Sequence, residues 1–327
     1  MTTLATEPQR SGTSGGVRRL LEVPDPVFHG LLGTVAALFA LLIVAFLVTM
    51  LYQARTAFSH FGLGFLTGTS WDPVHAHYGA LIFVVGTLET TFIAMLLAVP
   101  IGIGCALALA YGTPRRVSAP LSTAVEMGAA VPSVVFGLWG LLVLAPWTRE
   151  YIEPFLAHLT GGHGPFNGPQ IGVGLLLAGL ILFVMVLPTM VAISRDVFLA
   201  VPNEQIEAAY AMGATRWQVL RRVVVPSSRS GLLGASTLAM GRALGETMAV
   251  TMVIGNTDRF AHSLFGTTQT MSSLIANEFT EATEPFHLAS LMGIAVLLLL
   301  IAIIVNVLAR VLVRSLGRQR AIGLGAT

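Results

Sequence analysis

The chain has 327 residues, of which 54% are hydrophobic and only 10% are charged, and its formal net charge at pH 7 is +2. Soluble globular proteins carry roughly 25% charged residues, so this composition excludes a soluble globular protein and indicates an integral membrane protein. All 18 basic residues are arginine. A phosphate-binding loop of the G-x-x-x-x-G-K-[ST] kind needs a lysine, so any ATP-driven work requires another subunit.

Six apolar segments are each long enough to cross a membrane, because a transmembrane helix needs about 20 apolar residues. We therefore expect an all-α polytopic membrane protein with six transmembrane helices in one domain, 27–315, whose core is about 81–312. Residues 1–26 lack the apolar core of a signal peptide and predict a mobile cytoplasmic tail, and 316–327 predict a second cytoplasmic tail. The only cysteine, Cys105, is expected to be a small core residue. The segments are about 27–52, 81–111, 120–145, 171–193, 230–254 and 288–312.

The placement of arginine predicts how these segments are oriented. With the N-terminus inside, the cytoplasmic segments hold 14 arginines and the outer segments hold three, Arg55, Arg149 and Arg259. The remaining one, Arg242, is intramembrane. Cytoplasmic loops carry the excess of basic residues, so we expect a multi-pass protein of the bacterial plasma membrane with both termini in the cytoplasm.

The outer segments carry aromatic residues and one helical pattern. Trp71 and Trp147 are predicted to be anchors at the membrane interface. Leu274, Ile275 and Phe279 have helical spacing and predict a short helix in the third outer loop. That helix either dips into the outer face or closes the bundle as an ordinary loop helix.

A polar hairpin of two short helices is predicted in the loop 196–228. Asn203 is expected to cap the first helix, and Gly213 to break it. Thr215 begins the second helix, which Pro226 ends. Ala208 and Ala209 allow close packing in a partner's groove, and Glu207 can pair with a cation of the partner. The alternative is an ordinary amphipathic loop between two spans. The E-A-A-x3-G-x9-[IV]-x-[LV]-P pattern is met by Glu207, Ala208, Ala209, Gly213, Val223, Val225 and Pro226.

The fifth predicted span carries two charges, Arg242 and Glu246. Arg242 lies 11 residues after Gly231, about 16 Å along a helix and near the bilayer centre, where a charge costs at least about 2.5 kcal/mol. Glu246 is expected on the same face, one turn further out. The guanidinium fork suits two oxygens of an anion, and the glutamate would temper its charge so that the anion leaves again. A structural salt bridge, or a pair that holds two helices in register, is the alternative.

These two stretches resemble one known family over about 60–315. The hairpin resembles the EAA loop of ABC importer permeases, and the run GRALGETMAV from Gly241 resembles the fifth-span motif of phosphate importer permeases. Phe136 stands where that family is expected to carry tyrosine. Further matches favour the C-type of the two homologous permeases and lie at Trp71-Asp72-Pro73, Gly86-Thr87-Leu88, Pro132-Ser133-Val134-Val135, Gly137-Leu138-Trp139-Gly140 and Leu187-Pro188-Thr189.

The resemblance implies a type I ABC importer permease fold and a permease subunit of an ATP-driven importer of inorganic phosphate, which is not itself an enzyme. The implied partners are a homologous second permease, two cytoplasmic ATPase subunits, an external phosphate-binding protein and membrane lipid, with no cofactor and no nucleic acid. The ATPase would dock on Glu207, Ala208, Ala209, Gly213 and Arg216. The phosphate path would include Arg242, Glu246, Thr247, Glu89 and Glu126.

Four polar residues have competing interpretations. Glu89 and Glu126 either line the path or are protonated and packed against a helix. His75 and His77 have the spacing of metal ligands, but no third ligand lies nearby in sequence. A solvated loop is therefore the favoured interpretation of the histidines, and no metal site is expected.

Three other functions compete with phosphate import. A permease for another oxyanion, molybdate or sulfate, would carry the same hairpin, and only the GRALGET stretch favours phosphate. A self-sufficient ion-coupled transporter would need no docking hairpin and often has inverted repeats, which the sequence does not display. A membrane enzyme would need a nucleophile, a base or a metal cluster near the interface, and none is found.

Overall fold

The computed structural model describes residues 25–161 and 163–323, with side chains between 28 and 311. Of the two predicted tails, 1–24 and 324–327 lie outside the described residues. The rest of the predicted C-terminal tail continues the last helix. The chain divides into two compact units, Met1–Met50 and Leu51–Thr327.

Described by itself, the first unit consists of the greater part of helix α2 (Asp25–Phe61). The helix is long and apolar enough to span a membrane from Phe28 to Phe61, which extends the first predicted span, 27–52. It continues because no proline or glycine follows Gly33 until Gly62, whose φ of +54° ends the helix.

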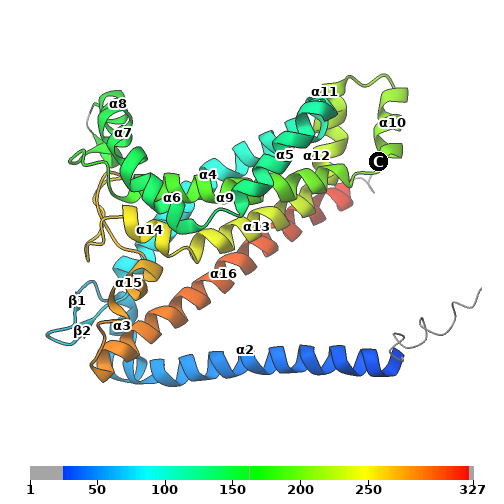
Figure 1. Ribbon diagram of the computed structural model, residues 1–327. Helices are drawn as coiled ribbons and strands as arrows, with labels where there is room; N and C mark the ends of the chain where they lie inside the picture. Colours follow the sequence, from blue (N-terminus) through cyan, green and yellow to red (C-terminus); the bar gives the residue numbers. More distant parts are fainter. Residues whose placement is uncertain (1–24, 162, 324–327) are drawn as a thin grey trace, which may run out of the picture. The chain divides into compact units, whose positions relative to one another are not determined.

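In its described residues, the second unit consists of helices, connecting loops and one antiparallel pair of short strands, in which Trp71 pairs with Tyr78. Figure 1 shows α10 and α11 at one end, here called the hairpin end, and α15 with the two strands at the other, the loop end. The elements are α3 (Leu63–Thr67), β1 (Trp71–Asp72), β2 (His77–Tyr78), α4 (Leu81–Leu107), a π-helix (Ala108–Gly112), α5 (Arg115–Ala129), α6 (Ser133–Trp139), a π-helix (Gly140–Leu144), α7 (Ala145–Trp147), a π-helix (Thr148–Ile152), α8 (Glu153–Leu159), a 3₁₀-helix (Gly164–Phe166), α9 (Leu175–Leu199), α10 (Asn203–Ala211), α11 (Arg216–Val219), a π-helix (Leu220–Val224), α12 (Val225–Ser227), α13 (Arg229–Leu244), α14 (Met248–Val253), α15 (Met271–Glu278) and α16 (Pro285–Gly323).

The predicted class, an all-α polytopic membrane protein, is confirmed, but the count of six spans is not. Among the described residues, four helices are long and apolar enough to cross a membrane, and a bent pair of helices raises the number to five. The four helical stretches are Phe28–Phe61, Leu81–Gly112, Leu175–Leu199 and Pro285–Val311.

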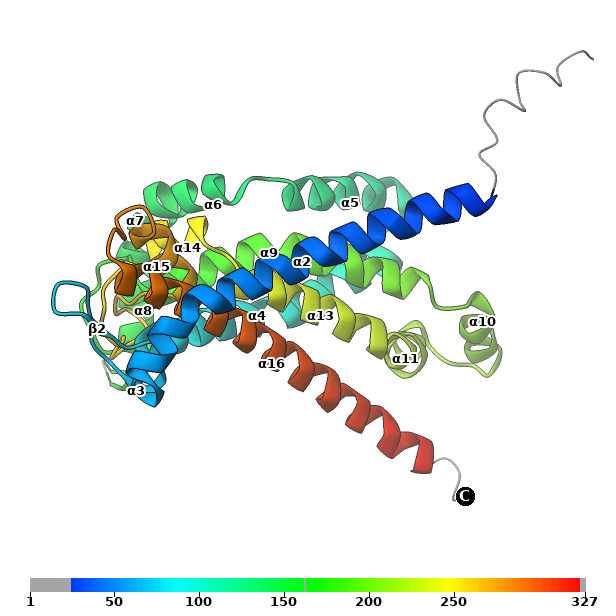
Figure 2. The ribbon, with the colours of Figure 1, turned by 90° about the horizontal axis from the view of Figure 1, so that it is seen from below.

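The third predicted span, 120–145, is bent. α5 ends at Ala129 and α6 begins at Ser133, and the two helical segments differ in direction by 93°. Pro132 has no N–H to continue the helical ladder, and it disfavours helical geometry at the residue before it. The ribbon between α5 and α6 in Figure 2 shows this break.

The fifth predicted span, 230–254, is broken into α13 and α14. α13 has 16 residues, so it rises only about 24 Å, less than the roughly 30 Å of hydrocarbon in a bilayer. Gly245 follows it, and the carboxylate of Glu246 accepts a hydrogen bond from Ala249 N at 3.2 Å. That bond satisfies an N–H in the first turn of α14, so the sequence itself supplies a second helix start.

The core lies where α4, α9, α13 and α14 pack together. α4 and α9 contact each other along most of their length, and they come close because Gly179 has no side chain. A Cβ at Gly179 would lie 2.5 Å from Ile93 Cγ2. On α13, one face is buried in this core through three alanines at helical spacing, Ala235, Ala239 and Ala243.

Two predictions about burial are wrong. Trp71 is 6% exposed and packs in a second core cluster at the loop end, so it is not an interface anchor, whereas Trp147 is 52% exposed. Cys105 is exposed on α4. The predicted outer-loop helix is confirmed as α15, and its first four residues are buried.

Candidate functional site

Arg242 joins three helices. It lies in the last turn of α13, where a cation is stabilised by the free carbonyl groups of a helix end. Its Nη1 donates to Thr189 Oγ1 of α9 at 3.2 Å, and its Nη2 donates to the carbonyl oxygen of Ala129 at 3.5 Å. Ala129 is the last residue of α5, so the guanidinium reaches the bend between α5 and α6.

A groove of about 1200 Å³ runs between α13 and α16 and includes Arg242 in its wall. The other lining residues are small or apolar side chains and a few polar ones. The polar and charged residues that line it are Thr189, Ser230, Thr237, Arg242, Asn306 and Arg310. Among the described residues, two arginines and no acidic residue line the groove, so it is suited to an anion.

Glu246 does not lie on the α13 face that carries Arg242, because α13 has already ended. Its carboxylate caps α14 through Ala249 N, and its backbone carbonyl accepts a hydrogen bond from Ser272 Oγ of α15 at 2.7 Å. Among the described residues no ion pair joins Glu246 to Arg242. The prediction of one shared helical face is therefore wrong, since helical spacing stops at the break after Leu244.

The remaining residues of the predicted path lie on three different elements. Thr247 lies in the break itself, and its Oγ1 donates to Gly245 O at 3.3 Å. Glu89 is half-buried on α4, and Glu126 is exposed on α5. Glu126 precedes Ala129 by three residues, so it lies about one turn from the carbonyl that Arg242 contacts. Its exposure means that it is not packed against a helix of this chain.

The polar hairpin forms as two short helices joined at Gly213. Its φ is +79°, a left-handed conformation that glycine adopts without strain. Thr215 caps α11 with a full capping box to Gln218, as expected. The predicted cap by Asn203 is wrong, because α10 begins with that residue and its side chain makes no capping bond. The second helix runs past Pro226 to Ser227.

Most of the predicted docking residues are exposed at the hairpin end, namely Glu207, Ala208, Gly213 and Arg216. Ala209 is the exception, since it is 5% exposed and packs against this chain's own core. Sequence reasoning missed the apolar residues beside them. Tyr210, Met212 and Trp217 are exposed by 46%, 84% and 64%, and exposed aromatic residues and methionine are typical of protein interfaces.

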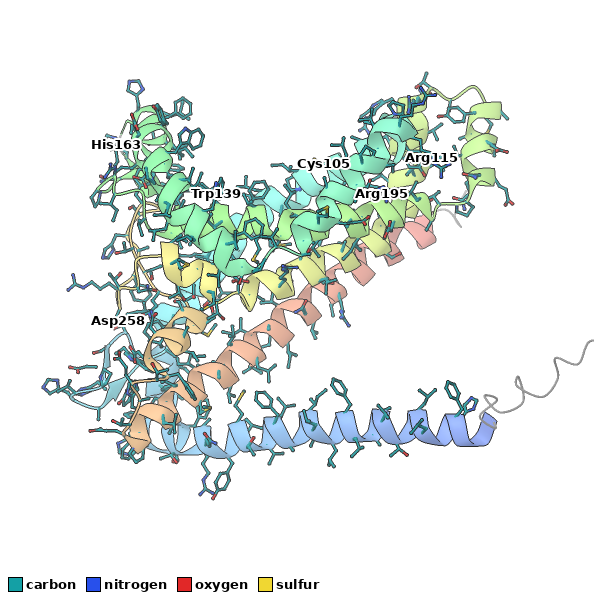
Figure 3. All side chains as sticks on the ribbon, in the orientation of Figure 1. Cys105, Arg115, Trp139, His163, Arg195 and Asp258 are labelled. Carbon is teal, nitrogen blue, oxygen red and sulfur yellow. The ribbon has the colours of Figure 1, made fainter. Side chains whose placement is uncertain are left out.

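At the loop end, a carboxylate ties distant segments together. Glu278 Oε2 accepts a hydrogen bond from Trp71 Nε1 at 2.9 Å and lies 2.8 Å from His287 Nε2. Desolvation by the surrounding protein, together with the charge of Glu278, raises the pKa of Asp258 to about 6. Figure 3 shows Asp258 and His163 toward the loop end, and Arg115 and Arg195 toward the hairpin end.

The raised pKa of Asp258 predicts a pH-dependent stability. The folded state holds the proton of Asp258 more tightly than the unfolded state does, so binding this proton stabilises the fold. Its contribution to the free energy of unfolding is complete below about pH 4 and is lost as the pH rises through about 6. Asp258→Asn should therefore be more stable than wild type above pH 6 and should flatten the dependence between pH 4 and 6. Thermal unfolding of the purified complex at several pH values measures this.

Asp72→Asn provides a control of opposite sign. A hydrogen bond from His75 lowers the pKa of Asp72, so its loss should reduce stability at neutral pH rather than raise it. If Asp258→Asn kept the pH-dependent stability of wild type, the dependence would not come from the raised pKa of Asp258.

Asp72 also contacts His75, one of the two histidines that have the spacing of metal ligands. His75 Nδ1 lies 2.6 Å from Asp72 Oδ2. Within the part of the chain that the structure describes, no three His, Cys, Asp or Glu side chains are grouped so as to hold a metal ion.

The sequence matches one family model and several curated proteins. The model, described as "Binding-protein-dependent transport system inner membrane component", matches residues 98–318. The phosphate transport system permease protein PstC of Mesorhizobium japonicum is 42% identical over 305 residues, covering 92% of this chain and 93% of that protein. The protein of the same name from Xylella fastidiosa is 42% identical over 317 residues, covering 95% and 97%.

Solved structures share the fold at low sequence identity. A bacterial ABC transporter involved in the import of the acidic polysaccharide alginate matches with a TM-score of 0.59 at 15% identity, covering 89% of this chain and 96% of the other. The native crystal form of the inward-facing MetNI methionine ABC transporter matches with a TM-score of 0.53 at 20% identity, covering 75% and 99%.

Proposed function

We propose a route for phosphate through this chain, because the chain belongs to the binding-protein-dependent transport system inner membrane components and is a permease subunit of a phosphate ABC transport system. It is a multi-pass inner-membrane protein and a permease rather than an ATPase. Membership of this family implies an ATPase and a binding protein as partners.

The number of membrane spans and the location of the two termini are also proposed here. The bent pair α5–α6 and the broken pair α13–α14 each complete a crossing, which gives six spans with both termini in the cytoplasm. The excess of arginine at the hairpin end supports this orientation, as Arg115 and Arg195 in Figure 3 illustrate. The complete transporter contains a homologous second permease, two ATPase subunits and an external phosphate-binding protein.

The unneutralised charge of Arg242 is the observation that carries the proposed route. Among the described residues, its two hydrogen-bond partners are a hydroxyl and a carbonyl, at 3.2 and 3.5 Å, and both are neutral. A charge inside a membrane protein requires a counter-charge or a polar cavity, and Arg242 lines the α13–α16 groove. A phosphate dianion would supply the missing charge, and two of its oxygens fit the guanidinium fork. Phosphate uptake by Arg242 variants tests this route.

Glu246, Thr247, Glu89 and Glu126 complete the proposed path in secondary roles. Glu246 stands at the break between α13 and α14, where it presents a carboxylate beside the route. Ionised carboxylates only accept hydrogen bonds. Phosphate carries a proton near neutral pH and can donate it, whereas sulfate carries none and would face the glutamate with bare oxygens. Glu246 therefore acts as a filter for phosphate.

Replacing Glu246 with glutamine should relax the exclusion of sulfate. The Oε1 of glutamine can still accept the bond from Ala249 N, so α14 keeps its cap, while the amide adds a donor. The mismatch with sulfate amounts to about 1–3 kcal/mol, so the phosphate-to-sulfate ratio should fall by about five- to 150-fold, and phosphate should leave more slowly. Uptake of both anions into proteoliposomes, in a binding-protein-independent variant, measures the ratio.

Glu246→Asp is the matched control, since it shortens the side chain but keeps the charge and should largely keep the ratio. An unchanged ratio in Glu246→Gln would place selectivity elsewhere in the transporter. The carboxylate would then serve only the helix start of α14.

The hairpin from Asn203 to Ser227 is the proposed dock for the ATPase. Glu207, Ala208, Gly213 and Arg216 supply its exposed polar surface, and Met212 and Trp217 supply apolar area. Ala209 contributes from inside, because its burial holds α10 against the core of the permease. The exposed residues of the hairpin are thus attached to a helix that packs on the permease core, so that a movement of the ATPase would be transmitted to the membrane helices.

A further inference from the structure

Two polar residues of α16 are not explained by the proposed route, Asn306 and Arg310. Both line the α13–α16 groove together with Arg242. Asn306 interrupts an apolar helix, and Arg310 is the last residue but one of the candidate span Pro285–Val311. Polar residues in such a helix usually face a bundle interior or a water-filled cavity and serve transport.

Asn306 faces α13 at Gly241, the residue before Arg242. Its Nδ2 donates to Ala302 O at 2.7 Å, and a Cβ at Gly241 would lie 3.9 Å from the same nitrogen. The amide therefore faces α13 beside Arg242, where Gly241 leaves room for it. Within the described residues, the second amide N–H has no protein acceptor, so it is available to a ligand.

Arg310 lies four residues after Asn306, about 6 Å further along α16 toward the hairpin end and on the same face. Its side chain is exposed, and among the described residues it pairs with no acid. No aspartate or glutamate occurs in α13 or anywhere after Glu284. The whole groove is therefore positively charged, with one arginine near each end and an amide between them.

We propose that the α13–α16 groove is the inner half of the anion route, in which inorganic phosphate leaves Arg242, passes the amide of Asn306 and reaches Arg310. This inference rests on the proposed role of Arg242. Successive donors along the groove divide one long step into shorter ones, and none binds the anion so tightly that it stays. Asn306 and Arg310 thus bind the anion in turn as it is released to the cytoplasmic side.

A lipid phosphate group offers the same chemistry as inorganic phosphate. Arginine near a helix end also contacts lipid headgroups. The two sources differ in their consequences. A lipid anchor at Arg310 would respond to the lipid composition but not to free phosphate, whereas a route for phosphate would respond to free phosphate.

The first experiment measures phosphate uptake by the complete transporter in cells that lack their own system. Asn306→Leu and Arg310→Gln should each lower the maximal rate by about tenfold or more, the size of one lost bond to a charged group. The KM should stay the same, because entry depends on the binding protein and Arg242. Arg310→Lys, which keeps the charge, should keep most of the rate. Arg116→Gln removes an exposed arginine of α5 outside the groove and should match wild type.

Wild-type rates in both Asn306→Leu and Arg310→Gln would overturn the inference. Arg242→Ala, assayed in parallel, separates this failure from failure of the proposed function. If only Arg242→Ala loses uptake, the proposed role of Arg242 stands, and the assignment of the α13–α16 groove as the inner half of the route is wrong. If Arg242→Ala is also normal, the proposed route itself fails.

The second experiment places a thiol in the groove. Asn306→Cys is made in a Cys105→Ala background, because the native cysteine is exposed, and a negatively charged thiol reagent is added to inverted membrane vesicles. Inorganic phosphate at its Kd should slow the modification about twofold, since half of the sites are then filled. Protection by phosphate supports the route.

Two other results would overturn it. If phosphate gives no protection but the rate changes when anionic lipids are replaced by phosphatidylcholine in nanodiscs, the groove holds lipid headgroups. If the thiol does not react at all, with or without nucleotide, the groove is sealed by protein.

Discussion

Arg242→Ala should abolish phosphate uptake while the permease remains assembled in the membrane. Among the described residues, Arg242 is the charge that the α13–α16 groove presents near the break between α13 and α14, and the substitution removes it. Bonds to a charged group are worth about 1.5–3 kcal/mol each, and the fork makes two, so uptake should fall at least about 100-fold. Arg242→Lys keeps the charge but loses the fork, so it should be partly active. Labelled phosphate uptake, normalised to the amount of complex in the membrane, measures both.

Thr189→Val separates anion binding from helix packing. Valine has nearly the shape of threonine but cannot accept the 3.2 Å bond from Arg242 Nη1. If Arg242 only tied α13 to α9, this variant would reproduce much of the loss. Because we assign Arg242 to the anion, Thr189→Val should keep most of the uptake. Normal transport by Arg242→Ala would make the residue a structural or dispensable one.

Gly213→Val should uncouple the permease from its ATPase. The φ of +79° at Gly213 is a conformation that valine strongly disfavours, at a cost on the order of 1–3 kcal/mol. A Cβ there would contact nothing within 4 Å, so the effect would come from the bend rather than from crowding inside the chain. ATPase co-purification and phosphate uptake should both fall about tenfold or more, and membrane insertion should be normal.

Gly213→Asn is the matched control, because asparagine tolerates the left-handed conformation far better than valine. It should retain docking and most of the uptake. Normal co-elution of the ATPase together with normal uptake in Gly213→Val would exclude the hairpin as the dock.

Local chemistry made the hairpin predictable from sequence. The break at Gly213 and the cap at Thr215 each depend on residues within four positions, and such signals are present in any short window. The same holds for the long apolar helices. Their length alone identifies them as candidate spans.

Averaged hydropathy predicts neither the bends nor the burial of Trp71, for two different reasons. Averaged hydropathy does not register the break at Pro132, because its neighbours are apolar on both sides. Trp71 is buried in a cluster that includes Met271 and Leu291, and Glu278, 207 positions later, accepts its indole N–H. Arg242 likewise contacts Ala129, 113 positions earlier. Tertiary contacts of this range are outside the reach of spacing rules. The wrong prediction for Glu246 has a local cause, because helical spacing stops where α13 ends at Leu244.

The shortness of α13 has a consequence for how the protein is made. A helix that rises about 24 Å and carries an arginine in its last turn is a poor substrate for independent insertion into a bilayer. It gains a favourable environment only when α9 supplies a hydroxyl at Thr189 and α5 supplies a carbonyl at Ala129. During synthesis, we therefore expect the translocon to keep α5 and α9 beside the newly made α13, so that α13 enters the membrane together with these two helices rather than as a single helix.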